Sequence, residues 1–190
     1  MKQIRIALHL LIIMTILLGF LYPLAITGVV WLAFQEKAEG SLISLGGTII
    51  GSRLIGQNFT SPRYFHGRPS ANNYNGTNSG GSNFGPTNRK LIDLAVKNIE
   101  QARKDNGLPT DAQIPSDLVL ASASGLDPHI SLDAALLQTG RIARARGMEQ
   151  KAIRDLVTEN AERPYFNAWG TPHVNVLKLN IALDAHGDYK

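Results

Sequence analysis

Residues 6–34 read IALHLLIIMTILLGFLYPLAITGVVWLAF and contain no Lys, Arg, Asp or Glu. As an α-helix this stretch would be about 43 Å long, whereas about 20 apolar residues suffice to cross the hydrocarbon core of a bilayer. The stretch is therefore long enough to span a membrane with some tilt. The sequence predicts a short tail over 1–5, a membrane-spanning helix over 6–34 and one domain over 35–190.

The charges that flank the apolar stretch predict its orientation. Lys2 and Arg5 precede it, whereas Lys37 follows it between Glu36 and Glu39. Positive charge gathers on the cytoplasmic side of spanning helices. We therefore expect a cytoplasmic N-terminus and a domain that faces outward, into a periplasm or extracellular space.

Two features of the apolar stretch leave alternatives open. A cleaved signal peptide also begins with positive charge, but its apolar region is only about 7–15 residues long, so an uncleaved anchor is favoured. Pro23 is expected to disturb the helix about one turn earlier. Gly19 and Gly28 would let another helix approach closely, although glycine is also common in spanning helices without a partner.

Composition excludes several classes of protein. The chain has 19 Lys plus Arg and 15 Asp plus Glu, and Lys2 and Arg5 precede the apolar stretch, so the remainder carries only about +2. That charge does not predict nucleic-acid binding. Because the chain has no cysteine, disulfides, thiolate metal sites and a cysteine nucleophile are excluded.

The pattern after the apolar stretch predicts an α+β fold, a mixed α/β domain with long loops rich in Gly and Asn. Short apolar runs broken by glycine over 41–59 predict two short strands. Residues 60–88 are dominated by Gly, Asn, Ser, Thr and Pro, but the interleaved aromatic residues favour an ordered loop whose Asn side chains bond its own backbone.

Capping residues and periodicity predict the remaining elements. Asn88 or Thr87 would cap a helix that ends near residue 105 and buries one face. Ser131 would cap a helix that runs to about residue 146, with Asp133 in its first turn. The other expected elements are a strand over 117–124, a turn over 125–130, a helix over 149–159, and a strand over 174–184, where a helix remains an alternative.

No sequence motif predicts catalysis or metal binding. The chain lacks a G-x-x-x-x-G-K-[ST] loop and an H-E-x-x-H spacing. The outer domain has four scattered histidines: His66, His129, His173 and His186. Each is expected to be an isolated surface or hydrogen-bonding residue, so no metal site is predicted. An alternative is a membrane-anchored periplasmic hydrolase that uses Asp127, His129 and Ser131, although no G-x-S-x-G elbow accompanies them.

Two groups of arginines have structural and functional interpretations. Arg141 and Arg144 share a helix face, which is usually solvated but is also a possible docking or anion-binding patch. Arg63, Arg68 and Arg89 lie among aromatic residues in or beside the long loop. They either bond loop carbonyls or belong to an interface, where arginine and aromatic residues are enriched.

Four segments together resemble one family. They are GSRLIGQNFTSPRYFHGRPSA (51–71), NYNGTNSGGSNFGPTN (73–88), LVLASASGLDPHIS (118–131) and RPYFNAWGTPHVNVLKLNIALD (163–184). With the N-terminal anchor they resemble the C chain of Kdp-type potassium-transporting P-type ATPases, over nearly the whole sequence. The resemblance implies a single-pass protein of the bacterial inner membrane in a high-affinity K⁺ uptake complex.

The resemblance also implies partners. They are a channel-like A chain, a B chain that hydrolyses ATP and a small F chain. The C chain would be non-catalytic, with no cofactor of its own, because ATP, Mg²⁺ and K⁺ are handled by the complex. It would be needed for assembly and coupled activity, and it is proposed in the family to raise the ATP affinity of the B chain.

A sensory ligand-binding domain is a third class of function, beside the pump subunit and the hydrolase.

Candidate contact residues follow from this reading. Loops 60–88 and 163–173 would cap the outer mouth of the A chain. The predicted partner-binding residues are Arg63, Tyr64, Phe65, Arg68, Tyr74, Phe84, Tyr165, Phe166 and Trp169. Because the domain is expected on the side opposite cytoplasmic ATP, an indirect effect on ATP affinity is consistent with the charges. Direct nucleotide contact would involve Ser122, Ser124, Arg141 and Arg144.

Overall fold

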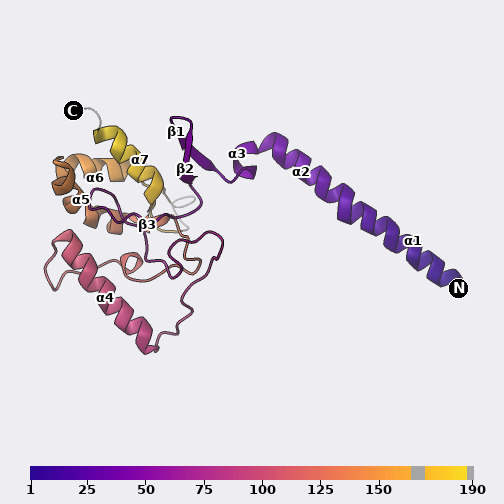
Figure 1. Cartoon of the computed structure of the whole chain (residues 1–190), viewed down its shortest axis with the longest axis horizontal. Coiled ribbons are helices and arrows are strands. Elements are labelled where there is room, and N and C mark those ends of the chain that lie inside the picture. Colours follow the sequence, from indigo (N-terminus) through magenta and orange to yellow (C-terminus); the bar gives the residue numbers. More distant parts are fainter. Residues whose placement is uncertain (164–169, 188–190) are drawn as a thin grey trace. The chain divides into compact units, whose positions relative to one another are not determined.

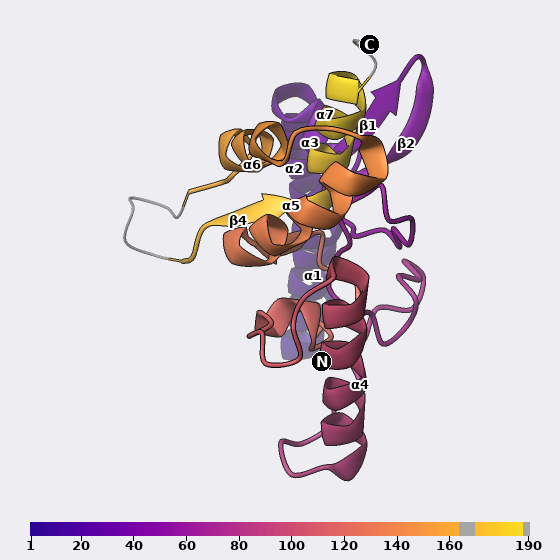
Figure 2. The same cartoon turned by 90° about the vertical axis from the view of Figure 1, so that its left-hand side faces the viewer.

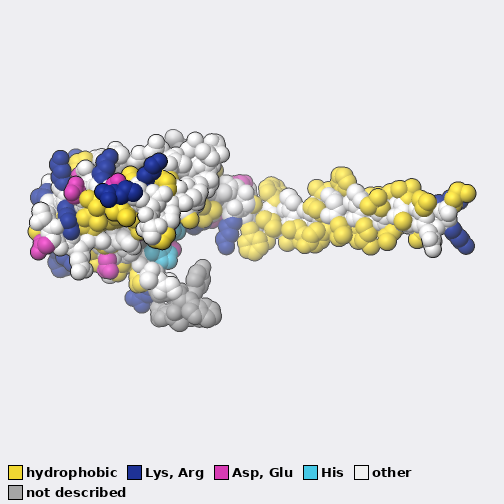
Figure 3. Space-filling view, turned by 90° about the horizontal axis from the view of Figure 1, so that it is seen from below, with side chains coloured by type: hydrophobic (Ala, Val, Ile, Leu, Met, Phe, Trp, Pro, Cys, Tyr) yellow, Lys and Arg dark blue, Asp and Glu magenta, His cyan; other side chains and the backbone are white. Residues whose placement is uncertain are grey.

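The computed structural model describes residues 1–163 and 170–187 and divides into two compact units, Met1–Leu42 and Ile43–Lys190 (Figure 1). The first unit is almost entirely helical. It contains α1 (Lys2–Ile16), the π-helical turn η1 (Leu17–Leu21), α2 (Tyr22–Ala33) and the short α3 (Gln35–Ala38). The helical run Lys2–Ala33 is long and apolar enough to cross a membrane, and none of its apolar window is buried. Figure 3 shows hydrophobic side chains along its length.

The π-helical turn lies where the sequence predicted a disturbance. Pro23 has no backbone N–H, so the carbonyl of Gly19 lacks its usual partner four residues on. The helix accommodates this with the wider turn Leu17–Leu21. The predicted N-terminal apolar helix is confirmed.

A hairpin of β1 (Leu42–Leu45) and β2 (Thr48–Ser52) begins at the last residue of the first unit. The two turn residues, Gly46 and Gly47, have φ values of +58° and +83°. Such a tight two-residue turn needs positive φ at both positions, which glycine adopts without strain. The predicted pair of short strands is confirmed, and no helix or strand follows until α4.

Helix α4 (Arg89–Asn106) begins and ends at the expected residues. The side chain of Asn88 accepts a hydrogen bond from the N–H of Lys90, and Gly107 has the left-handed conformation that ends helices. Leu94 of this helix is 45% exposed, so it lies outside the part of α4 that packs against the domain. Helix α4 extends away from the group formed by α5, α6 and α7 in both views (Figures 1 and 2).

The core lies among α5 (Leu132–Arg146), α6 (Gln150–Glu159), α7 (Val176–Gly187) and a small antiparallel sheet of β3 (His129–Ser131) and β4 (His173–Asn175). The fully buried side chains include Phe65, Ile130, Ile142, Ile153, Val157, Val174, Leu179 and Leu183. Ser131 caps α5 as predicted, and Gly147 ends it. The mixed α/β class is therefore confirmed.

Two predicted strands are wrong. Residues 117–124 contain no strand, and the short 3₁₀-helix η2 (Ser116–Leu118) begins that segment. Residues 176–187 form α7 instead of a strand. The buried residues Val176, Leu179 and Leu183 recur at helical spacing, and the side chain of Asn175 accepts a hydrogen bond from the N–H of Lys178, as an N-cap does.

Candidate functional site

Residues 61–66, which we call the Phe65 segment, are held against α5 and α7 by two side-chain amides. Asn180 pairs with both backbone groups of Phe65, at 2.8 and 3.1 Å. Gln138 does the same for His66, also at 2.8 and 3.1 Å. These bonds satisfy backbone groups that have no partner in a helix or sheet. They also fix Phe65 in the core, where its exposed fraction is 0%.

Arg141 of α5 is a second support of the Phe65 segment. Its Nη1 donates to the carbonyl oxygens of Pro62 and Tyr64, at 2.7 and 2.9 Å. Its Nε and Nη2 donate to Asn106 and Gln138, at 3.2 and 2.6 Å. Burial lowers the pKa of Arg141 to about 10, so the guanidinium keeps its charge at neutral pH. The interpretation of this arginine as part of a solvated face is wrong, because only 5% of it is exposed and the loop carbonyls use its donors.

The residues predicted for direct nucleotide contact are not joined by hydrogen bonds. Ser122 is buried, and the carbonyl of Ser124 accepts from the N–H of Gly80 at 2.8 Å. Arg144 is exposed and donates to the carbonyl of Asn106 at 3.2 Å. Within the described residues, no hydrogen bond links the two serines to the two arginines, so this site stays a prediction.

Tyr64 lies in a small charged cluster at the surface. Its hydroxyl donates to Asp184 at 3.0 Å, and Asp184 forms an ion pair with Arg146 at 2.6 Å. The guanidinium of Arg146 also lies 4.9 Å from the centre of the tyrosine ring. This arrangement fixes the aromatic side chain beside a cation, as is common in protein interfaces.

The other predicted partner-binding residues differ in exposure. Arg63 is exposed, Phe65 is buried, and Arg68, Tyr74 and Phe84 are half-buried, while Tyr165, Phe166 and Trp169 lie outside the described residues. Phe65 thus serves the core, and the exposed and half-buried residues are the ones that a partner could reach.

Asp127 anchors a polar cluster next to β3. It forms an ion pair with Arg68 at 3.1 Å and accepts a hydrogen bond from the N–H of His129 at 2.9 Å. Burial opposes ionisation of Asp127, but the hydrogen bonds from His129 and the charge of Arg68 together lower its pKa. A Cβ atom at Gly56 would lie 2.6 Å from the carbonyl oxygen of Asp127 and 2.7 Å from Tyr74, so only glycine fits there.

Asp127, His129 and Ser131 do not form the relay of a serine hydrolase. The hydroxyl of Ser131 donates to Asp117 at 3.2 Å and accepts from the N–H of Ala134 at 3.1 Å. In the described parts of the chain, no hydrogen bond joins His129 to Ser131. Ser131 therefore acts as a helix cap and is not activated by a neighbouring base.

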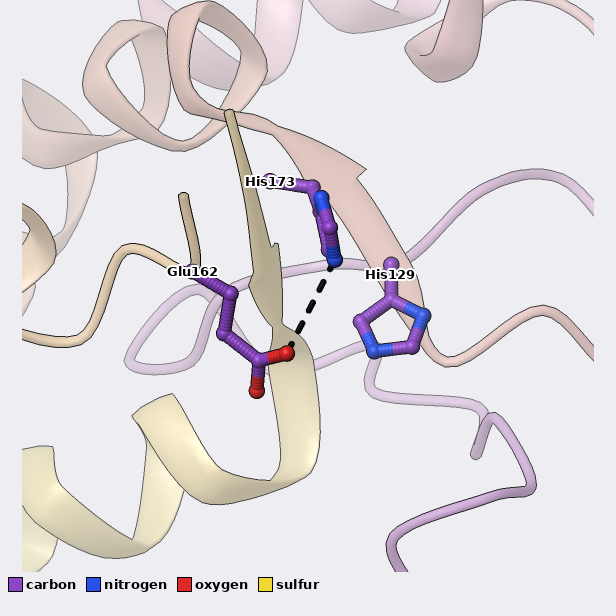
Figure 4. Close-up of side chains that lie close together, drawn as sticks. All are labelled: His129, Glu162 and His173. Carbon is purple, nitrogen blue, oxygen red and sulfur yellow. Dashed lines mark ion pairs between the residues drawn. The ribbon is translucent and has the colours of Figure 1, made fainter. Parts of the chain in front are cut away.

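Two of the histidines that are far apart in the sequence meet at the β3–β4 sheet (Figure 4). The rings of His129 and His173 have centres 4.9 Å apart and are nearly perpendicular. Nε2 of His173 lies 3.7 Å from Glu162, whose other oxygen accepts from Lys178 at 2.9 Å. The hydrogen bond from Lys178 is the main reason that the pKa of Glu162 is lowered. Sequence spacing gave no sign of this cluster, because strand pairing creates it.

The surface of the second unit carries several large apolar side chains that are between 38% and 61% exposed. They are Leu45, Ile49, Leu54, Ile55, Ile92, Leu94, Val96 and Leu120. Three of them, Ile92, Leu94 and Val96, lie within two turns of α4 among Arg89, Lys90 and Lys97. Ile92 and Val96 are one turn apart and share a face of α4, and contiguous exposed apolar side chains often mark a protein–protein contact.

A polar cavity of about 330 Å³ opens between residues 58–74 and α4. Its lining includes His66, Arg68, Tyr74 and Asp105. The pKa of His66 is lowered, mainly by burial and then by the charge of Arg141, which favours a neutral ring. The cavity therefore presents the neutral ring of His66 beside one arginine and one aspartate, Arg68 and Asp105.

Comparison with known proteins assigns the family. The family model described as K⁺-transporting ATPase, c chain (KdpC), matches residues 4–185. The chain is 46% identical over 199 residues to the potassium-transporting ATPase KdpC subunit of Rhodopseudomonas palustris (strain BisB18), covering 97% of this chain and 98% of that protein. It is 50% identical over 191 residues to the KdpC subunit of Herminiimonas arsenicoxydans, covering 97% of this chain and 98% of that protein. It is 48% identical over 176 residues to the KdpC subunit of Koribacter versatilis (strain Ellin345), covering 91% of this chain and 89% of that protein. The chain therefore belongs to the KdpC family, the c chain of K⁺-transporting ATPases.

Proposed function

We propose that the chain is a non-catalytic accessory subunit of an ATP-driven, high-affinity K⁺ uptake complex, required for its assembly and coupled activity. The family match over residues 4–185 carries this proposal, because relatives of nearly the same length are named as subunits of potassium-transporting ATPases. The catalytic work belongs to a separate B chain, with a channel-like A chain and a small F chain as further partners. ATP, Mg²⁺ and K⁺ are handled by the complex.

The apolar helix over Lys2–Ala33 anchors the chain in the bacterial inner membrane. Its apolar side chains are unburied, so lipid or another spanning helix must cover them. Lys2 and Arg5 favour a cytoplasmic N-terminus, which puts the second unit in the periplasm.

The orientation predicts a clear result in a protease experiment. Protease added to intact spheroplasts is expected to digest the second unit, because that unit faces the medium once the outer membrane is removed. In sealed inverted vesicles the same unit should be protected. Immunoblotting with an antibody against residues 89–106 follows the cleavage, and protection in spheroplasts with digestion in inverted vesicles would contradict the orientation.

The outer domain contacts the A chain through loops 60–88 and 163–173. Exposed side chains support this surface: Arg63 lies in the first loop, and the apolar Ile92 and Val96 follow on α4. An effect on the ATP affinity of the B chain would then pass through conformational coupling between the chains.

A pull-down tests the assembly proposal. The tagged chain, purified from detergent-solubilised membranes of cells that express the whole complex, is expected to bring down the A, B and F chains in constant ratio. The double variant Ile92→Asp/Val96→Asp should reduce recovery, because it places two charges on an apolar contact. The exposed pair Lys151→Asp/Asp155→Lys on α6 is the matched control, since it preserves local charge balance. Recovery of the wild-type chain alone would contradict the proposal.

A further inference from the structure

Three side chains from separate segments converge at the surface of the second unit: His129 of β3, Glu162, and His173 of β4 (Figure 4). One ligand atom from each lies within 4.8 Å of the other two. The side chains are 35%, 42% and 37% exposed, so water and ions can reach them. We propose that His129, Glu162 and His173 form a binding site for a divalent transition-metal ion such as Zn²⁺.

Backbone pairing places the three residues together. His129 lies opposite Asn175 in the antiparallel register, and Ser131 lies opposite His173. The two histidines are therefore diagonal neighbours on one face of the sheet. On the other side of β4, Glu162 exchanges two backbone hydrogen bonds with His173, at 2.8 and 3.2 Å. Backbone hydrogen bonds therefore fix the relative positions of the three residues that carry the proposed ligands.

The imidazole of His173 is oriented as metal-ligating histidines usually are, and Nδ1 of His129 faces a carboxylate at ion-pair distance. Nδ1 of His173 lies 3.0 Å from the carbonyl oxygen of Thr171, and Nδ1 of His129 lies 3.6 Å from the carboxylate of Asp127. A ligating histidine usually donates its second ring N–H to such an oxygen, which leaves the Nε2 lone pair for the metal. The side-chain amide nitrogen of Asn175 lies 3.5 Å from Nε2 of His129, a contact that a bound metal would replace.

The donor set favours zinc-like ions over the cations used by the pump. Two imidazoles and one carboxylate, with water as a fourth ligand, are a common zinc environment. K⁺ and Mg²⁺ prefer oxygen ligands alone. Bonds of about 2.0–2.1 Å in a tetrahedron place ligand atoms about 3.3 Å apart, so the side chains, whose ligand atoms lie within 4.8 Å of one another, must close in by at most about 1.5 Å.

One neighbouring residue opposes the metal. Lys178 lies 2.9 Å from one oxygen of Glu162 and leaves the other oxygen on the side of His173. Its positive charge repels a bound cation and competes for the carboxylate. Lys178 therefore offers a variant with an effect opposite to that of losing a ligand.

Calorimetric titration of the purified full-length chain in detergent with Zn²⁺, in buffer that contains K⁺ and Mg²⁺, tests the site. We expect one Zn²⁺ per chain, and His129→Gln, Glu162→Gln and His173→Gln should each weaken binding by about tenfold or more. His186→Gln, at an exposed histidine of α7, is the matched control and should bind as the wild type does. Co²⁺ bound at the wild-type site should give the intense visible absorption of tetrahedral coordination, which the ligand variants lose.

The variant Lys178→Met tests whether weaker Zn²⁺ binding in the ligand variants comes from the lost ligand or from a misfolded protein. It should tighten Zn²⁺ binding several-fold, a gain that misfolding does not produce. Absence of Zn²⁺ binding by the wild-type chain, or binding that persists unchanged in the double variant His129→Gln/His173→Gln, would overturn the proposal. Weaker binding by Lys178→Met with an intact circular dichroism spectrum would overturn it as well.

Discussion

Deletion of residues 2–34 is expected to abolish co-purification of the chain with the other subunits of the pump. The deleted helix is the only one in the described residues that is long and apolar enough to cross a membrane. Without it the second unit loses the confinement to the membrane that is expected to keep it close to its partners. Tethering alone raises apparent affinity by about 10²–10⁴-fold, so recovery should fall by about 100-fold or more. Quantitative immunoblotting of the partner chains after pull-down measures the loss.

A matched variant separates tethering from specific helix contacts. Residues 6–34 are replaced by an unrelated spanning helix of Leu and Ala of the same length, with Lys2 and Arg5 retained. If Gly19 and Gly28 provide a close contact with another helix, this chain reaches the membrane but recovers less partner than the wild type does. A Cβ atom at Gly28 would meet nothing within 4 Å in this chain, so that position is open to a partner. Full recovery after deletion of 2–34 would contradict the role of the anchor.

Helices α4 and α5 of the outer domain could be predicted because capping residues next to their ends specify where they begin and stop. Asn88 and Ser131 accept hydrogen bonds from backbone N–H groups two or three residues on, and Gly107 and Gly147 adopt positive φ at the other ends. Each signal depends only on near neighbours, so it can be read without knowledge of the tertiary fold.

For residues 174–184 the local sequence pattern did not determine the secondary structure. Leu177, Leu179, Ile181 and Leu183 alternate with polar or small residues and so match a strand, but Val176, Leu179 and Leu183 match a helix equally well. Burial from the rest of the domain decides between the two periods, and Leu179 and Leu183 are fully buried on one face of α7.

The candidate sites depend on contacts between distant segments and were largely beyond sequence reasoning. His129 and His173 meet only through the register of β3 and β4. Arg141 shares a helix face with the exposed Arg144, yet it is buried, and its donors bond the carbonyl oxygens of an irregular loop. The sequence predicted a turn over 125–130, although β3 already begins at His129, and it predicted the Arg-rich helix α5. It could not say which side chains of these two segments face one another.

Arg141→Met is expected to destabilise the chain by about 3–5 kcal/mol, because it removes the hydrogen bonds that a buried guanidinium donates to four buried or partly buried oxygens. The carbonyls of Pro62 and Tyr64 and the side chains of Asn106 and Gln138 would all lose a hydrogen bond. Urea unfolding of the full-length chain in detergent, followed by near-ultraviolet circular dichroism, measures the change. Arg141→Lys should recover only part of the loss, since an ammonium group cannot reproduce the planar fork of donors.

Arg144→Met is the matched control, because Arg144 lies one turn along the same helix but is exposed. It should cost about 1 kcal/mol or less. An equal cost for the two variants would show that Arg141 does not support the Phe65 segment.

The comparison of the two variants also decides how a loss of pump activity is interpreted. If Arg141→Met impairs the complex in proportion to its loss of stability, Arg141 acts by positioning the loop that carries Arg63 and Tyr64. Impairment by Arg144→Met without destabilisation would instead favour the anion-binding prediction for this face of α5.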